Sequence, residues 1–177
     1  MMHHAALIGS LALASGSLQF ESAAVVPDAA AADPAVSRRN QLTIHQVMGL
    51  TTLGGLAVTG ILGSAFSFQR QAPASVTGPL GTAHLAGSAL TGLCYLTTAA
   101  LALTAPQEPY ESPYEGVDTV LVHKGLALLH GAGMVSTVGL GLLAARQDSS
   151  LLPYHQVLGF TTFALLSASA AVIAIDF

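Results

Sequence analysis

The sequence predicts an all-α integral membrane protein, built as a four-helix bundle. Hydrophobic residues make up 52% of the 177 residues and charged residues only 8%, whereas a soluble domain carries roughly 25% charged residues. The apolar residues gather in four long blocks, at about 42–66, 80–104, 119–145 and 152–175. Each block is long enough for a helix across the hydrocarbon core, which needs about 20 residues. We therefore expect one transmembrane domain over residues 42–177.

Two N-terminal segments precede this domain. An apolar run at 5–20, followed by small residues, is typical of a secretory signal, so we interpret residues 1–22 as a signal peptide. The usual basic residues ahead of the run are missing, and a fifth helix on the membrane surface is the alternative. Residues 23–41 are rich in Ala and Pro and have no pattern that could bury a face, which predicts a flexible tail.

The four spans divide the remaining segments between two sides of the membrane. The tail, the loop at 105–118 and the C-terminus share side X, while the loops at 67–79 and 146–151 lie on side Y. Basic residues favour the cytoplasm, but here they divide three to two between X and Y and decide nothing. A cleaved signal peptide would deliver the start of the first span to the outside. We therefore predict that the tail and the 105–118 loop lie outside, in the periplasm.

Charge and cysteine content exclude other classes of protein. The net charge is −4 and the sequence contains no basic patch, so nucleic acid is not an expected partner. The single cysteine, Cys94, lies within a span and cannot form an intrachain disulfide. Membrane lipid is the expected surrounding of the four spans.

Histidines inside the apolar spans are the residues that point to chemistry. An ionisable side chain in a bilayer is costly unless it has a partner, and it usually marks a functional site. Histidines that only join helices by hydrogen bonds are the alternative interpretation. Each span carries at least one, and the full set is His45, His84, His123, His130 and His155.

Four of these histidines lie at matching depths. Counted from expected helix starts at Asn40, Pro79, Asp118 and Ser150, the residue five places on is always a histidine. Because alternate spans run in opposite directions, His45 and His123 fall near side X. By the same argument, His84 and His155 fall near side Y. Two layers of two imidazoles suit the axial positions of haem iron, whereas zinc would need four protein ligands in one layer.

The third span offers two ligand candidates. His130 stands seven residues after His123, on the same face and about 10 Å deeper. The sequence HLAG at His84 resembles HGAG at His130, which favours His130, while equal depth favours His123. We take His123 as the ligand, with His130 as its alternative, because axial ligation requires matching depth.

Small and hydroxylated residues accompany the histidines. Threonines lie seven residues beyond three of them and are expected to line the interior, with their hydroxyls bonded back to helix carbonyls. Glycines one turn beyond three of the histidines would remove bulk beside a flat macrocycle, although such glycines also mark close helix contacts. The threonines are Thr52, Thr91 and Thr162, and the glycines are Gly49, Gly87 and Gly159.

The pattern resembles the cytochrome b561 superfamily in its bacterial, four-span form. The resemblance covers about residues 42–175 and rests on HQVMG, HLAG, VHKG and HQVLG around the histidines. HQVMGLTTL of the first span also recurs as HQVLGFTTF in the fourth. The family implies a membrane electron carrier with two b-type haems between histidines of alternate spans. Many members have six spans or a fused soluble module, and with four spans this chain leaves the donor and acceptor open.

The expected function is transmembrane electron transfer by two b-type haems, each ligated by two histidines. No iron position is then left for a substrate, so we expect an electron carrier or transmembrane oxidoreductase without catalytic residues of its own. Its partners would be a quinol, a small reductant or another cytochrome, within a larger redox complex or a homodimer. The alternatives are a histidine-lined proton or metal-ion transporter and a non-redox structural subunit.

Overall fold

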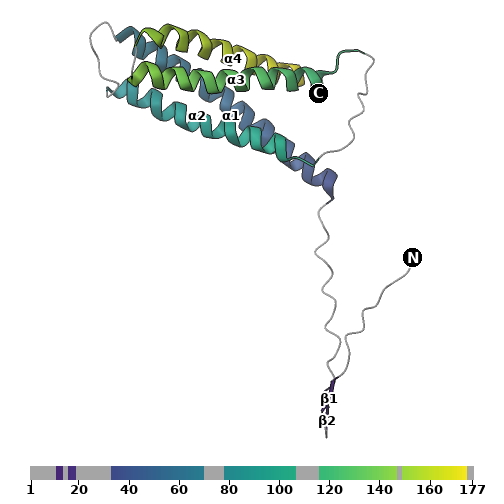
Figure 1. The fold of residues 1–177 in the computed structure, drawn as a ribbon. Coiled ribbons are helices and arrows are strands. Elements are labelled where there is room, and N and C mark those ends of the chain that lie inside the picture. Colours follow the sequence, from purple (N-terminus) through teal and green to yellow (C-terminus); the bar gives the residue numbers. More distant parts are fainter. Residues whose placement is uncertain are drawn as a thin grey trace.

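Four long helices make up the fold of the computed structural model, which describes residues 11–13, 16–18, 33–69, 78–106, 116–146 and 149–174. Successive helices run in opposite directions (Figure 1). The predicted all-α, four-helix membrane bundle is confirmed. The helices are α1 (Pro34–Gln69), α2 (Pro79–Thr104), α3 (Thr119–Arg146) and α4 (Leu152–Ala174), with a 3₁₀ turn, η1 (Ser149–Leu151), before α4.

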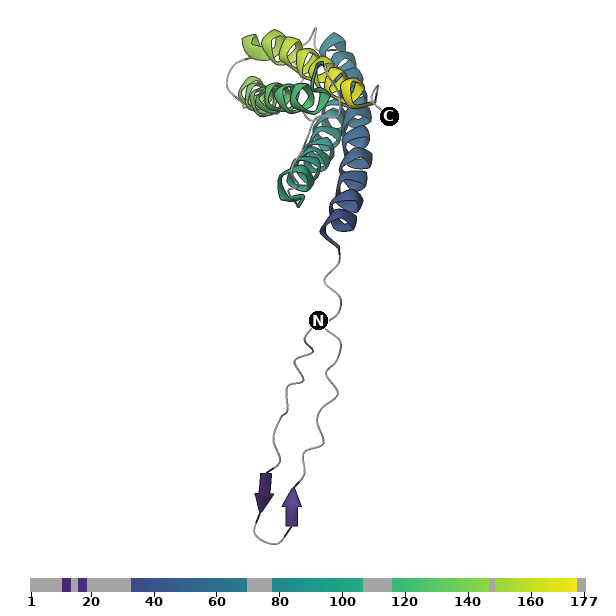
Figure 2. The ribbon, with the colours of Figure 1, turned by 90° about the vertical axis from the view of Figure 1, so that its right-hand side faces the viewer.

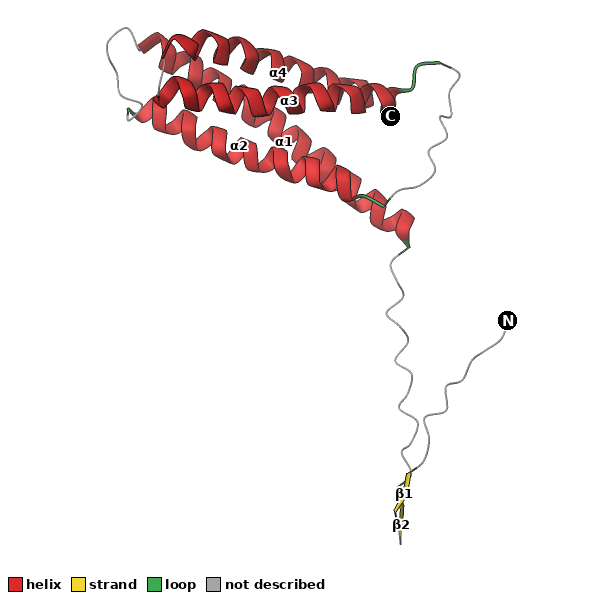
Figure 3. Ribbon diagram, in the orientation of Figure 1, coloured by secondary structure: helices red, strands yellow, loops and turns green. Residues whose placement is uncertain are grey.

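The described part of the N-terminal segment is extended rather than helical. Strands β1 (Leu11–Leu13) and β2 (Gly16–Leu18) pair antiparallel, and Figure 3 shows them in yellow, apart from the bundle. They lie within residues 1–22, the predicted signal peptide, for which a helix on the membrane surface is the alternative. Cleavage of that segment stays a prediction. The other residues of 1–22, and residues 23–32 of the predicted tail, lie outside the described part of the chain.

Helix α1 begins earlier than expected. Its first residue is Pro34 rather than Asn40, so residues 34–41 of the predicted flexible tail are helical. Asp33 explains this start, because its Oδ1 accepts a hydrogen bond of 2.9 Å from the backbone N–H of Ala35. An Asp cap followed by Pro at the first position is a favoured way to begin a helix.

The other helix starts lie close to their predicted positions. Helix α2 begins at Pro79, as expected. Asp118 caps α3, since its Oδ1 accepts a hydrogen bond of 2.9 Å from the N–H of Leu121. The turn η1 begins at Ser149, one residue before the expected start of the fourth span, and continues into α4. These boundaries set the depths of the interior residues.

The helices form two hairpins. Helix α1 packs along α2 and α3 along α4, and the hairpins meet where α1 packs against α4. Within the described residues, no Cα atom of α2 comes within 8 Å of a Cα atom of α3. Figure 2 shows the α1–α2 hairpin diverging from the α3–α4 hairpin toward the end that carries the start of α1. The two hairpins are therefore joined closely along one side only.

The bundle exposes its large apolar side chains and buries polar ones, which is the reverse of a soluble protein. Large apolar side chains such as Ile61, Leu103 and Leu128 are more than two-thirds exposed. The buried polar residues are Thr52, Thr59, Thr91, His130, Thr162 and Ser169. An apolar exterior with small and polar residues between the helices is the arrangement that lipid favours, because lipid gives apolar side chains no reason to turn inward. All four helices are long and apolar enough to cross a membrane.

Two neighbouring glycines of α1 provide a test of the helix packing, because only one of them lies against another helix. A Cβ atom added at Gly55 would lie 2.5 Å from Oγ1 of Thr91 on α2, whereas one added at Gly54 would meet nothing within 4 Å. We expect Gly55→Ala to destabilise the bundle by about 1–3 kcal/mol through overpacking. Gly54→Ala should be neutral or stabilise it by up to about 1 kcal/mol. Unfolding in detergent, followed by circular dichroism, measures both; equal stabilities would contradict the contact.

Candidate cofactor site between the helices

Two pairs of imidazoles meet across the interior of the bundle. The rings of His45 on α1 and His123 on α3 have centroids 6.3 Å apart and planes at 85°. The rings of His84 on α2 and His155 on α4 have centroids 6.2 Å apart and planes at 89°. Helices α1 and α3, and likewise α2 and α4, belong to different hairpins. The structure therefore brings the imidazoles together in the two pairs predicted from their depths, while their binding of haem stays a prediction.

All four rings are held through Nδ1 by the backbone of a neighbouring helix. A ring whose Nδ1–H donates to a carbonyl keeps Nε2 as the unprotonated nitrogen, which is the tautomer and orientation found in metal-bound histidines. The carbonyls belong to residues of the other helix in the same hairpin. The Nδ1–oxygen distances are 2.9 Å for His45–Thr98, 2.9 Å for His84–Thr59, 2.9 Å for His123–Ser169 and 2.8 Å for His155–Thr137.

A single spacing places these groups in every helix. In α1, His45 is followed after seven residues by the buried Thr52 and after another seven by Thr59, whose carbonyl holds His84. Each helix thus gives a histidine to one layer and a carbonyl to the other. Fourteen residues of helix rise about 21 Å, which is the separation of the two layers. The remaining series are His84, Thr91 and Thr98; His123, His130 and Thr137; and His155, Thr162 and Ser169.

The ring separations fit a metal bound between two imidazoles. Each ring centre is separated from a bound metal by one metal–nitrogen bond of about 2.0 Å and by the distance from that nitrogen to the ring centre. For two rings on opposite sides of one metal, the centroids are then about 6.2 Å apart. The observed separations are 6.3 and 6.2 Å. Perpendicular planes are compatible with this, because the planes of two imidazoles that bind one metal need not be parallel. When two rings meet edge to face without a metal, their centroids lie anywhere from about 4.5 to 7 Å apart. Such contact alone does not require the same centroid separation in both layers.

Two ligands per layer suit haem better than zinc. Among the described residues, no group of three or more His, Cys, Asp or Glu side chains comes together. Structural zinc sites take four such ligands and catalytic zinc sites three. A porphyrin supplies four equatorial nitrogens of its own, so two histidines complete the coordination of its iron. Each layer therefore contains the number of imidazoles that a haem iron takes as protein ligands.

The two hairpins repeat the same set of contacts. His45 and Thr59 of α1 take the places that His123 and Thr137 take in α3. On α2 and α4, His84 corresponds to His155 in the same way. The bundle is therefore a parallel two-fold repeat of one hairpin. The HLAG and HGAG likeness suggests a different match, of His84 with His130, which these contacts do not support.

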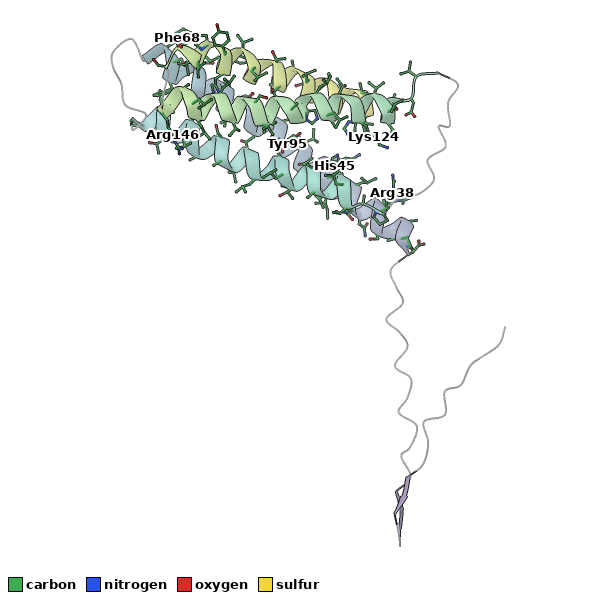
Figure 4. All side chains as sticks on the ribbon, viewed as in Figure 1. Arg38, His45, Phe68, Tyr95, Lys124 and Arg146 are labelled. Atoms are coloured by element: carbon green, nitrogen blue, oxygen red, sulfur yellow. The ribbon has the colours of Figure 1, made fainter. Side chains whose placement is uncertain are left out.

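His130 lies apart from the four paired histidines. It is 6% exposed, and its Nδ1 lies 3.1 Å from the hydroxyl of Tyr95 on α2. Figure 4 labels Tyr95 and His45, which both lie on the sides of their helices that face α3. On the third span, the structure thus places His123 opposite His45 and gives His130 a different partner. The assignment of His123 rather than His130 as a ligand stays a prediction.

The predicted threonines line the interior as expected. Thr52, Thr91 and Thr162 are at most 5% exposed. Their hydroxyls each donate a hydrogen bond of 2.8 Å to a carbonyl one turn earlier in the same helix. Together with His130, which holds the corresponding position in α3, they form a buried layer midway between the two histidine pairs. We call these four residues the middle layer.

Different glycines lie beside the imidazoles than the sequence suggests. A Cβ atom added at Gly63 would lie 2.9 Å from Cε1 of His84, and one at Gly141 would lie 2.8 Å from Cε1 of His155. The glycines predicted to make room for a macrocycle face threonine side chains of the neighbouring helix instead, so they allow close helix packing. The threonine contacts are Gly49 with Thr98, Gly87 with Thr59 and Gly159 with Thr137.

The carbonyl partners and Tyr95 were not among the sequence-based candidates. A signal for the carbonyls exists, because Ser or Thr stands fourteen residues after each paired histidine. Tyr95 has no such signal, since a lone tyrosine in an apolar span is equally consistent with packing or an interfacial position. Comparison of the chain with family models, curated proteins and solved structures finds no match.

Proposed function

We propose that this chain is a membrane electron carrier that binds two b-type haems. His45 and His123 would ligate one iron through Nε2, and His84 and His155 would ligate the other. The observation that carries the proposal is the pair of cross-bundle imidazole contacts, at 6.3 and 6.2 Å, with all four Nδ1 atoms bonded to backbone carbonyls. Histidine pairs buried only for packing would not need this common arrangement.

The residues of the site supply orientation and basicity. Bonding of Nδ1–H to a carbonyl fixes the ring against rotation and increases the basicity of Nε2 as a ligand. When bound, haem would supply one-electron chemistry, its iron changing between the ferric and ferrous states. Because both axial positions would be filled by imidazole, substrate has no place on the iron. The chain would therefore pass electrons rather than catalyse a reaction on its own.

The depth of the two layers supports transfer across the membrane. The histidine pairs are separated by about 21 Å of helix rise, which is most of a hydrocarbon core of about 30 Å. The His45–His123 pair lies toward side X and the His84–His155 pair toward side Y. An electron that enters at one layer and leaves at the other would thus cross much of the bilayer.

The ends of the helices suggest where partners would meet the chain. Arg38 and Lys124 lie toward the X end and Arg146 toward the Y end (Figure 4). Cations near the X layer suit haem propionates or an anionic reductant, and long basic side chains also favour the membrane interface. We propose that the protein lies in a bacterial inner membrane, with side X facing the periplasm. A quinol, a small reductant or another cytochrome would be the partner, as in b561-like carriers.

One observation favours a second candidate, a proton-conducting membrane protein. The middle layer and Tyr95 place buried polar groups between the two histidine pairs. Among the described residues, however, the carboxylates are Asp33 and Asp118, both at helix starts rather than within a span. A path built for protons would be expected to place acidic groups along its length.

Haem content separates these functions directly. We expect protein purified from cells supplied with a haem precursor to show the sharp α and Soret bands of reduced b-type haem. Pyridine haemochrome quantification should give two haems per chain, because there are two imidazole pairs. A colourless preparation under these conditions would refute the redox function and leave the proton-conducting alternative. One haem per chain would restrict the proposal to a single layer.

A further inference from the structure

Tyr95 and His130 form a buried pair halfway between the two proposed haem layers. The Tyr95 hydroxyl lies 3.1 Å from Nδ1 of His130, and the two rings have centroids 5.7 Å apart. His130 follows His123 by seven residues and precedes Thr137, whose carbonyl holds His155, by seven. The pair is therefore about 10 Å of helix rise from each layer.

This pair breaks the two-fold repeat of the bundle. The residue of α1 that corresponds to His130 is Thr52, and the residue of α4 that corresponds to Tyr95 is Leu166. Both departures from the repeat meet in one hydrogen bond. They also lie on the side where α2 and α3 stay more than 8 Å apart at their Cα atoms within the described residues. Two coordinated changes in one place point to a role that the repeated hairpin does not provide.

The surroundings of His130 contain little that could fix its charge. The titratable groups that face it are Tyr95 from α2 and, two turns away on its own helix, His123. Helices α1 and α4 present Thr52 and Thr162 at this depth, and both hydroxyls are already bonded to their own helix carbonyls. No carboxylate of the described spans lies in the middle layer. His130 is buried, and the charges left to act on it are those at the two histidine layers.

We propose that the Tyr95–His130 pair is a proton-binding site that fills when electrons reach the two layers. This inference rests on the proposed electron-carrier function. One electron comes from a one-electron donor, and one proton comes from water and forms an N–H bond on His130. In the neutral tautomer of His130 that carries its hydrogen on Nε2, the Tyr95 hydroxyl donates to Nδ1. The added proton then binds at Nδ1, the hydrogen bond reverses, and Nδ1–H donates to the Tyr95 oxygen.

Electrostatics gives the sign and size of the coupling. Reduction removes one positive charge from a layer about 10 Å away. At an effective dielectric constant of about 20, this raises the proton affinity of His130 about tenfold for each layer. The bound proton in turn stabilises the reduced state. The reduction potential is therefore higher at low pH and falls as the pH rises through the titration of His130.

The test is an equilibrium redox titration of the haem-loaded protein between about pH 5.5 and 8.5, followed by visible absorption. A tenfold change in proton affinity corresponds to a total potential change of about 59 mV for a one-electron couple. We expect that change in the wild-type protein and in Thr52→Val, which alters a middle-layer residue that does not titrate. His130→Thr, which installs the residue found in the other half of the repeat, should make the potentials independent of pH over this range.

A second measurement covers the case in which His130→Thr does not fold. A redox-induced infrared difference spectrum of wild-type protein with ring-labelled tyrosine should contain a tyrosine C–O band, which Tyr95→Phe removes. Potentials that do not change with pH in the wild type would overturn the proposal, as would a pH dependence retained in His130→Thr or the absence of a tyrosine band. A colourless preparation is a different outcome, since it overturns the electron-carrier function as well.

Discussion

Replacing His45 by alanine is expected to remove one of the two haems and to leave the other in place. His45 supplies one of the two imidazoles near side X, and its loss leaves His123 alone in that layer. The His84–His155 pair lies about 21 Å away in helix rise and shares no ligand with it. Pyridine haemochrome quantification should therefore fall from two haems per chain to one. His155→Ala should give the same count by emptying the other layer.

His130→Ala provides the matched control for these two variants. His130 is also a buried histidine of a span, but its partner is Tyr95 rather than another imidazole. We expect this variant to keep both haems. If it lost a haem while His123→Ala kept two, the ligand on α3 would be His130 and the assignment would be reversed. Loss of both haems in every histidine variant would instead indicate general unfolding, which circular dichroism of the same samples detects.

Replacing Gly141 by alanine should weaken haem binding at the Y layer alone. The added Cβ would lie 2.8 Å from Cε1 and 2.9 Å from Nδ1 of His155, closer than van der Waals contact allows. The ring must then turn away from its hydrogen bond with the Thr137 carbonyl and from His84. Overpacking of this kind costs about 1–3 kcal/mol, which weakens binding on the order of tenfold. Haem titration of the apo-protein measures the effect.

Gly139, on the same helix, provides the control for Gly141→Ala. A Cβ atom added at Gly139 would meet nothing within 4 Å, so Gly139→Ala should bind haem in both layers as the wild type does. The X layer should also be unaffected in Gly141→Ala, because its contacts lie about 21 Å away along the bundle. Equal haem affinities of the Gly139 and Gly141 variants would show that the His155 ring does not need this space.

The repetition of the histidine arrangement in two layers supports a ligand role. A single close pair of histidines in a membrane protein is readily explained by packing. Here the same ring contact and the same Nδ1–carbonyl bond occur in two layers, and each helix takes part in both. Tyr95 and His130 stand out against this regular background because they form a buried hydrogen-bonded pair in one half, where the other half has Leu166 and Thr52.

The heights of the interior residues could be predicted from the sequence. Lipid requires each apolar block to satisfy its backbone hydrogen bonds internally, so each block must be a helix. A helix has a fixed rise, and successive spans alternate in direction, so a histidine five residues inside each expected start falls into one of two layers. The start of α1 at Pro34 rather than Asn40 does not change this, because the added residues precede His45 and leave it paired with His123.

The lateral contacts were decided by the tertiary structure alone. Sequence spacing gives the height and face of a residue, but the order of helices around the bundle and the rotation of each ring depend on packing between segments far apart in the chain. Only the packed hairpins show that His123 faces His45 while His130 meets Tyr95. They also show that the rings are held by carbonyls, whose position is invisible in a side-chain pattern, because every residue carries one.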